Sequence, residues 1–350
     1  MPKRLVATAP RVAELLDYTD PSLEDTQVRV AISHASPKHG SELAAFRGES
    51  PHDEDYYDDD WKLFLPRQSQ KGVPFGDWNL GNQWVGIVTE VGAGIDDVQV
   101  GDRLCGYGGI RETHLVTVGK DQRLKKMPVD MPWQNAVCFD PAQFALGAVR
   151  DSGLKLGDTV IVVGLGAIGQ LAVQMCKLAG ASLVIAVDPI ASRREIARLV
   201  GADVVMDPDT MDVGFEAKKL TNHLGVDVVL ETSAHWKALQ QALRGLAYGG
   251  TIAYAGWARP FGEGLDLGRE AHFNAGQIVF SRACSEPNRD YPRWSWKRIQ
   301  DECWSLLQSN QLNCLPLIEP VVSFEDCGFA YMEHVDRHPE TSIKLGIVFP

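Results

Sequence analysis

An apolar run leads directly into a glycine motif at Thr159-Val160-Ile161-Val162-Val163-Gly164-Leu165-Gly166-Ala167-Ile168-Gly169. Residues 171–178 then carry apolar side chains at helical spacing, and a second apolar run at 183–187 ends on Asp188. This acid follows the last glycine by about 20 positions, as in units that bind a dinucleotide. The order of strand, glycines, helix, strand and acid therefore predicts a βαβ unit with a dinucleotide site.

Each part of the glycine motif has a physical role. Gly164 permits a tight turn, Gly166 lets the backbone approach a pyrophosphate, and Gly169 lets the helix pack closely on the strand. The helix begins at Ala167 and Ile168, where unpaired N–H groups and partial positive charge attract phosphates. We predict cofactor contacts at all five residues. The alternative is a glycine-rich turn without a ligand.

Asp188 is the expected contact to the adenosine ribose. A carboxylate there accepts hydrogen bonds from the ribose hydroxyls and repels a 2′-phosphate, which favours NAD over NADP. Arg193 is predicted either to cover the adenine or pair with a phosphate, or to be a surface residue of the second helix. Four more candidate cofactor contacts follow from their positions after later strands: Ser233, Gly256, Trp257 and Arg282.

The pattern of the chain changes character twice. Residues 26–120 read as short strands separated by turns, and residues 144–285 alternate strands with helices, which predicts a doubly wound parallel sheet. A helix is expected at about 293–309, and a closing strand within 342–349. The expected strands of the parallel sheet are 159–163, 183–187, 203–206, 227–230, 250–254 and 278–281.

Composition limits the classes of function. The chain has 350 residues and a formal net charge of −12, which argues against nucleic acid or an anionic membrane surface as a partner. No apolar run approaches the roughly 20 residues of a membrane span. The apolar stretch at the start of the chain is too short for a signal peptide. The seven cysteines are widely spaced and form no C-x-x-C pair. We therefore expect no disulfides, no cysteine-based zinc cluster and a reducing cytoplasm.

An acidic run stands out at Glu49-Ser50-Pro51-His52-Asp53-Glu54-Asp55-Tyr56-Tyr57-Asp58-Asp59-Asp60-Trp61. Such a run is typical of a solvated loop. The alternative is a substrate-facing lid that attracts an amine or binds sugar hydroxyls. Tryptophans stack on the C–H faces of sugars, and Trp61, Trp78 and Trp84 lie in this part of the chain. Core packing is the alternative for each of them.

Three further segments are shared with a known family: Gly86-Ile87-Val88-Thr89-Glu90-Val91-Gly92, Val100-Gly101-Asp102-Arg103-Leu104 and Leu156-Gly157-Asp158-Thr159-Val160. Together with the glycine motif, they resemble the medium-chain dehydrogenase/reductases, in particular the alcohol, sorbitol and threonine dehydrogenase branch. The resemblance implies an α/β protein with two domains. A GroES-like β catalytic domain would comprise residues 1–143 and 286–350, and a Rossmann nucleotide domain residues 144–285. It also implies a homodimer or homotetramer, with the strand at 278–281 as the edge.

The resemblance fails at the positions that hold the family's catalytic zinc. The family's cysteine corresponds to His39 in His39-Gly40-Ser41-Glu42-Leu43, its histidine to Asn82, and its third ligand to Asp140. Catalytic zinc needs three protein donors, so His39 and Asp140 would need His52 or a carboxylate of residues 53–60 as a third. The cysteine lobe that holds the family's structural zinc is missing after residue 103. We expect no structural zinc and do not favour a catalytic one.

Without a metal, removal of a hydride from a carbinol needs a side-chain base. His39 is the first candidate because the ordinary pKa of histidine lies near neutral pH. The alternative is a neutral, hydrogen-bonding residue that fills the volume of the former ligand. Ser41 occupies the proton-relay position of related enzymes, and Asp140 is expected to orient His39. Asn82 and Gln83 are expected to bond substrate hydroxyls or the nicotinamide carboxamide.

These observations favour an NAD-dependent dehydrogenase that oxidises a secondary hydroxyl of a polyol, sugar or cyclitol. Two alternatives stay open. One is a metal-free reductase of enones or quinones, although such reductases mostly use NADPH and Asp188 argues against that cofactor. The other is an NAD-binding redox sensor without turnover.

Overall fold

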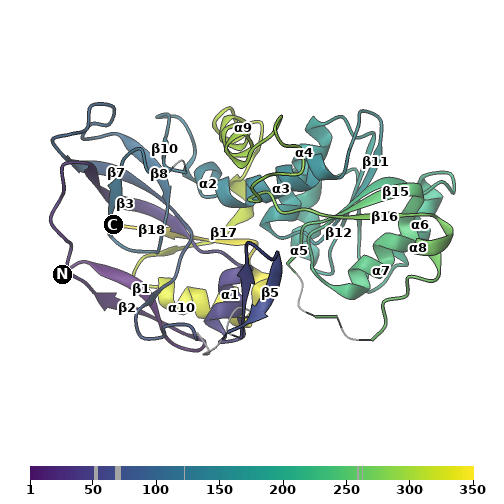
Figure 1. Cartoon of the computed structure of the whole chain (residues 1–350), viewed down its shortest axis with the longest axis horizontal. Coiled ribbons are helices and arrows are strands. Elements are labelled where there is room, and N and C mark those ends of the chain that lie inside the picture. The colour runs from purple at the N-terminus through teal and green to yellow at the C-terminus, as the bar shows by residue number, and fades with distance from the viewer. Residues whose placement is uncertain (51–53, 68–71, 122, 258–259, 262) are drawn as a thin grey trace. The chain divides into compact units, whose positions relative to one another are not determined.

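The structure is a computed structural model that describes residues 1–50, 54–67, 72–121, 123–257, 260–261 and 263–350 (Figure 1). The chain divides into two compact units. Unit 1 comprises Met1–Val137 and Ile318–Pro350, and unit 2 comprises Cys138–Leu317. His52 and Asp53, named above as metal donors, lie outside the described residues.

Unit 1 is built on antiparallel strands. Its largest sheet has the order β10-β8-β7-β3-β18-β17, with β9 also paired to β3, and a smaller sheet has the order β2-β1-β6. Only β17 and β18 pair in parallel among the strands of these two sheets in the described part of the chain. The strands are β1 (Lys3–Ala9), β2 (Val12–Asp17), β3 (Gln27–Ser36), β6 (Trp78–Asn79), β7 (Gln83–Val91), β8 (Arg103–Tyr107), β9 (Thr113–Thr117), β10 (Lys125–Lys126), β17 (Ile318–Ser323) and β18 (Lys344–Val348).

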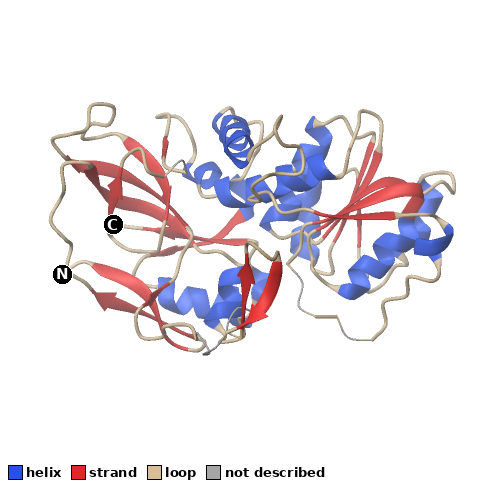
Figure 2. Ribbon diagram, viewed as in Figure 1, coloured by secondary structure: helices blue, strands red, loops and turns tan. Residues whose placement is uncertain are grey.

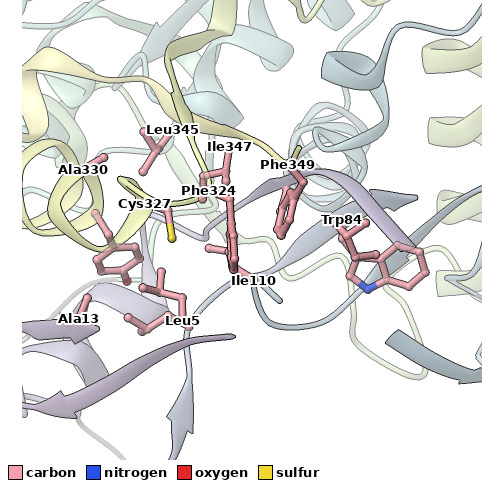
Figure 3. Packing of buried hydrophobic residues seen from close by; sticks show 14 of the residues in the cluster. Leu5, Ala13, Trp84, Ile110, Phe324, Cys327, Ala330, Leu345, Ile347 and Phe349 are labelled. Atoms are coloured by element: carbon pink, nitrogen blue, oxygen red, sulfur yellow. The ribbon is translucent and has the colours of Figure 1, made fainter. Parts of the chain in front are cut away.

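The strands of unit 1 enclose a hydrophobic core, and short helices lie between them in the chain. Alternate residues of β3 are buried, as expected of a strand that faces a core on one side. The core includes Leu5, Trp84, Leu345 and Ile347, which Figure 3 shows packed together from several strands. The helical elements of unit 1 are α1 (Ser41–Phe46), α2 (Trp133–Ala136), α10 (Cys327–Ala330), the π-helix η2 (Tyr331–Arg337) and the 3-10 turn η3 (Pro339–Thr341).

Unit 2 is a parallel sheet of six strands in the order β13-β12-β11-β14-β15-β16, with its helices packed around it (Figure 2). The order reverses between β11 and β14, which is where open α/β sheets bind ligands, outside the carboxyl ends of the strands. The elements are α3 (Phe139–Asp151), β11 (Thr159–Val163), α4 (Ala167–Leu178), β12 (Leu183–Val187), α5 (Ala191–Leu199), β13 (Val204–Met206), α6 (Val213–Leu220), β14 (Val226–Glu231), α7 (Trp236–Gly245), β15 (Leu246–Tyr254), α8 (Glu270–Phe273), β16 (Gln277–Phe280), α9 (Trp296–Gln308) and the 3-10 turn η1 (Leu315–Leu317).

The predicted fold class is confirmed, with a GroES-like β unit and a Rossmann-type parallel sheet. All six predicted strands of the parallel sheet are present, and only β15 differs much in length, starting at Leu246 instead of residue 250. The described residues contain no helix that is both long enough and apolar enough to span a membrane.

The boundaries of the compact units differ from the predicted domain boundaries. Residues 138–143 and 286–317 belong to unit 2, although the prediction assigned them to the catalytic domain. The cause is side-chain packing of α9 on α3. Trp304 meets Phe139 edge to face at 5.4 Å, and Trp296 Nε1 donates to Gln143 Oε1 at 2.9 Å.

Candidate active site

Three neighbouring strands bring the predicted catalytic segments of unit 1 together. In the largest sheet β3 lies between β7 and β18, so the end of β3, the start of β7 and the start of β18 are adjacent. Ser36, the last residue of β3, pairs with Gln83, and the Asn82 N–H donates to the Ser36 carbonyl at 3.3 Å. The segment 37–40 that follows β3 carries His39.

His39 is half-buried, and the backbone N–H of Leu345 donates to its Nε2 at 3.1 Å. A nitrogen that accepts this bond carries no proton, so in the neutral ring the proton is on Nδ1. This arrangement matches the hydrogen-bonding alternative considered above. Base chemistry at Nε2 would require the Leu345 bond to open when substrate binds, and catalytic hydrogen bonds often rearrange in this way.

The other predicted catalytic residues occupy different environments. Ser41 is exposed at the start of α1, and Asn82 is half-buried with its backbone carbonyl accepting from the Gly108 N–H at 3.1 Å. Asp140 lies in the first turn of α3, in unit 2, and is 8% exposed. Gln83 is fully buried and donates to the Ala136 carbonyl at 3.4 Å, which argues against the predicted substrate contact for this residue.

Two carboxylates, one half-buried in α1 and one buried at the end of β14, were not predicted as site residues. Glu42 follows Ser41 in α1, and burial raises its pKa. Glu231 ends β14 with no exposed surface, and its carboxylate accepts the N–H groups of Ser233 at 2.9 Å and Ala234 at 3.2 Å. In the sequence, both residues could have been found as acids next to a turn of small residues or glycine.

The glycine turn of unit 2 has the geometry that its motif predicts. Gly164 has a φ of +85°, and a Cβ there would lie 2.7 Å from the Ser233 nitrogen. A Cβ on Gly169 would lie 1.8 Å from the Gly164 carbonyl oxygen. A Cβ on Gly166 would meet nothing within 4 Å, as expected where a ligand, and not the protein, approaches the backbone. Ala167 and Ile168 then open α4, and no side chain caps that helix start.

Asp188 follows β12 and is 4% exposed. Its Oδ2 accepts from the Leu165 N–H at 2.7 Å, and its Oδ1 accepts from the Ile190 N–H at 2.9 Å. The carboxylate therefore holds the glycine turn as well as offering its remaining lone pairs to a ligand. Arg193 Nη1 lies 3.9 Å from Asp188 Oδ2, so this arginine is directed towards the acid and not away from the turn.

The remaining cofactor candidates lie at the carboxyl ends of later strands. Ser233 follows β14, and its hydroxyl donates to Glu231 in a short hydrogen bond. A Cβ on Gly256, after β15, would lie 2.7 Å from the Ala234 nitrogen. Trp257 and Arg282 are both exposed, at the ends of β15 and β16. The sheet therefore places all of these residues at one edge of unit 2.

Known proteins with similar sequences match residues of both units. A protein-family model described as "Zinc-binding dehydrogenase" matches residues 167–299. D-guloside 3-dehydrogenase from Escherichia coli K12 is 53% identical over 99% of this chain and 100% of its own length. The chain belongs to the medium-chain dehydrogenase/reductase family. It is an oxidoreductase of that family.

Solved structures of medium-chain dehydrogenases share the fold over the whole chain. The 2R,3R-butanediol dehydrogenase from Bacillus subtilis has a TM-score of 0.76 at 21% identity, with 99% of both chains covered. A zinc-binding dehydrogenase from Sinorhizobium meliloti, solved with NADP bound, has a TM-score of 0.76 at 20% identity and the same coverage. At these identities the likeness shows the fold alone.

The residues at the family's metal positions do not fit a catalytic zinc. His39 uses Nε2 to accept the Leu345 N–H, and Asn82 offers an amide in place of an imidazole. No three His, Cys, Asp or Glu side chains gather in a metal-binding group among the residues that the structure describes. Catalytic zinc is held by three protein donors of these types, so no step is assigned to a metal here.

The last part of the acidic run contributes to a hairpin of β4 (Asp55–Asp58) and β5 (Leu63–Pro66) in unit 1. Tyr57 and Phe64 face each other across it, with ring centroids 5.3 Å apart, and are 45% and 54% exposed. Trp61 in the turn is 73% exposed, whereas Trp84 in β7 is buried and stacks on His114. Core packing is therefore correct for Trp84, and residues 55–66 form a hairpin with exposed aromatic rings.

Proposed function

We propose that this protein oxidises a secondary ring hydroxyl of a glycoside, or of a related polyol, to a ketone, with NAD as the hydride acceptor. The observation that carries the proposal is the identity of 53% to D-guloside 3-dehydrogenase over the full length of both chains. The fold supports it, because unit 2 offers the turn that a dinucleotide requires and unit 1 places polar side chains at adjoining strand ends.

The choice of NAD rests on Asp188. Its buried carboxylate lies beside the glycine turn and accepts the Leu165 and Ile190 N–H groups. A ribose 2′-hydroxyl donates well to such a carboxylate, whereas a 2′-phosphate is repelled by it. Arg193 beside the acid would attract a 2′-phosphate, and its pairing with Asp188 weakens that attraction.

NAD held at the glycine turn would accept the hydride that the carbinol carbon loses, and the hydroxyl proton would pass to the protein. His39 accepts that proton at Nε2 after the Leu345 bond opens, with Ser41 as the relay. Asn82 bonds a second substrate hydroxyl. The residues at the family's metal positions support a reaction without zinc, in which the His39 imidazole takes the proton of the hydroxyl.

The substrate assignment is tested with purified protein, NAD and a panel of methyl glycosides, free hexoses, cyclitols and aminocyclitols, with NADH formation as the signal. We expect turnover with glycosides, including D-gulosides, and a weaker response with NADP. Turnover on none of the panel, with NAD still bound, would favour the redox-sensor alternative. NADPH consumption with an enone or quinone would favour the reductase.

We also propose a homo-oligomer that forms through unit 2. Strand β16 is the edge of the six-stranded sheet, and Phe280 on it is 78% exposed. An apolar edge strand pairs readily with another strand, and a second copy of the chain provides an identical one. Light scattering of Phe280→Lys should give a smaller particle than the wild type, and an unchanged mass would contradict this interface.

A further inference from the structure

Three segments of unit 1 meet at the carboxylate of Glu42. Its Oε1 accepts from the Lys38 N–H at 3.3 Å and from the Tyr331 hydroxyl at 3.0 Å, and its Oε2 accepts from the Gly81 N–H at 2.7 Å. The three donors are distant in sequence. One precedes His39, one precedes Asn82, and one begins the π-helix η2.

The backbone conformation of Gly81 explains why its N–H group can reach Glu42. Gly81 has a φ of +131°, and a Cβ there would lie 2.6 Å from the Ile110 nitrogen. The backbone can therefore turn its N–H towards Glu42 only at a residue without a side chain. Asn82 follows at once, so the position of its side chain depends on the bond between Gly81 and Glu42.

The π-helix η2 holds the other end of α1 as well. Arg47, which caps α1, donates from Nε to Asp336 Oδ1 at 2.6 Å and from Nη2 to the Asp336 carbonyl at 2.7 Å. Tyr331 and Asp336 both lie in η2 and are both buried. The short helix after His39 is thus fixed at both ends by one element, and π-helical segments of this kind often occur at functional sites.

We propose that Glu42 is a positioning residue that sets the relative placement of His39 and Asn82, with Tyr331 as its fixed support. Its effect on turnover rests on the proposed dehydrogenase function, while its effect on His39 does not. A small displacement of groups that hold a substrate is enough to lower the rate strongly. A purely structural carboxylate would change stability and leave both His39 and turnover as they are.

The test compares Tyr331→Phe and Glu42→Gln with the wild type, using Tyr18→Phe as the matched control. Tyr18 is also a buried tyrosine of unit 1, and its hydroxyl accepts the Thr113 N–H at 3.1 Å, away from Glu42. We expect Tyr331→Phe to lower kcat about tenfold and Glu42→Gln to lower it about a hundredfold. The affinity for NAD should stay unchanged, and Tyr18→Phe should keep the wild-type kcat. Glu42→Asp, which keeps the carboxyl group, should recover part of the loss.

A second readout is independent of turnover. In protein labelled with 15N-histidine, the His39 signals are assigned by comparison with His39→Asn. They should report an unprotonated, hydrogen-bonded Nε2 in the wild type and a shifted signal in Tyr331→Phe and Glu42→Gln. If the wild type turns over no glycoside but these shifts appear, the proposed function fails and the positioning role stands. Unchanged His39 signals in both variants, or an equal loss of kcat in Tyr18→Phe, would overturn the role of Glu42.

Discussion

The glycine turn of unit 2 and the His39 segment of unit 1 position functional groups in different ways. The turn at residues 164–169 is fixed by the backbone, because Gly164 and Gly169 lack the Cβ atoms that would collide with Ser233 and with the turn itself. The His39 segment is fixed by hydrogen bonds to distant parts of the chain: Glu42 accepts from the Gly81 N–H and the Tyr331 hydroxyl, and the Leu345 N–H donates to His39. The first arrangement is local in sequence, and the second depends on the pairing of distant strands.

This difference determines how each region should respond to substitution. A local backbone turn fails when one atom is added where no space exists, and it tolerates changes elsewhere. A segment held by hydrogen bonds to several distant parts of the chain loses its geometry in steps, because each donor contributes separately. Substitutions in the two regions should therefore differ in their effects, and the largest is expected in the glycine turn.

Gly169→Ala should be the most damaging change in unit 2. The added Cβ would lie 1.8 Å from the Gly164 oxygen, so the turn must shift, at a cost of roughly 1–3 kcal/mol. We expect a lower melting temperature and NAD binding weakened on the order of a hundredfold, the equivalent of about 3 kcal/mol. Fluorescence titration with NADH measures the affinity.

Gly166→Ala is the matched control for this prediction. Its Cβ would meet no protein atom within 4 Å, so the melting temperature should stay at the wild-type value while NAD binding weakens. Equal loss of stability in the two variants would show that the turn is not the steric feature described here.

Acid should destabilise unit 1 through His114. Burial is the main cause that lowers the pKa of His114 to about 4, from 6.5. The unfolded chain therefore binds more protons between these pH values, and stability is complete above pH 6.5 and is lost as pH falls towards 4. The shift corresponds to about 3 kcal/mol.

Urea unfolding at pH 7.5 and pH 5, followed by tryptophan fluorescence, measures this loss. Trp84 stacks on His114 with ring centroids 5.0 Å apart, so its emission reports on unit 1. His114→Gln should flatten the pH dependence. An equally steep dependence in that variant would assign the effect to another group.

Asp188→Asn should weaken NAD binding about tenfold and NADP binding less. An amide cannot accept the Leu165 and Ile190 N–H groups at both of its ends, and a hydrogen bond to a charged group contributes about 1.5–3 kcal/mol. Asp203→Asn is the control, because Asp203 also accepts a backbone N–H in unit 2, from Val184 at 2.7 Å. Unchanged NAD affinity in Asp188→Asn, or an equal loss in the control, would remove Asp188 from the cofactor site.

Trp61→Ala should have the smallest effect. Because Trp61 is 73% exposed, its loss should leave the melting temperature unchanged. If the hairpin contacts the glycoside, KM should rise about threefold, as expected for the loss of about 0.6 kcal/mol of contact. Phe273→Ala, at an aromatic residue of unit 2 that is 78% exposed, should leave KM unchanged. An unchanged KM in Trp61→Ala would support the solvated-loop alternative.

Much of the fold could be predicted from the sequence. The six strands of unit 2 follow from apolar runs separated by helices, and the glycine turn follows from residues adjacent in the chain. The packing of α9 on α3 could not be predicted, because it depends on which apolar faces meet, such as those of Phe139 and Trp304.

The candidate site could be predicted only in part. The position of His39 follows from its motif, but its hydrogen bond to Leu345 depends on how the end of β3 meets β18. The role of Glu42 was hidden for the same reason, since its donors come from three separated segments. Asp188 was predicted as a ligand contact, and its two bonds to the backbone require the folded turn.

The most direct test of the central claim is NADH formation from a methyl D-guloside by protein dialysed against a strong chelator, with His39→Asn in parallel. We predict that wild-type turnover survives chelation and that His39→Asn loses about a hundredfold or more in kcat with unchanged NAD affinity. Turnover that disappears on chelation and returns with zinc would contradict a metal-free reaction, and full activity of His39→Asn would contradict the assignment of the base.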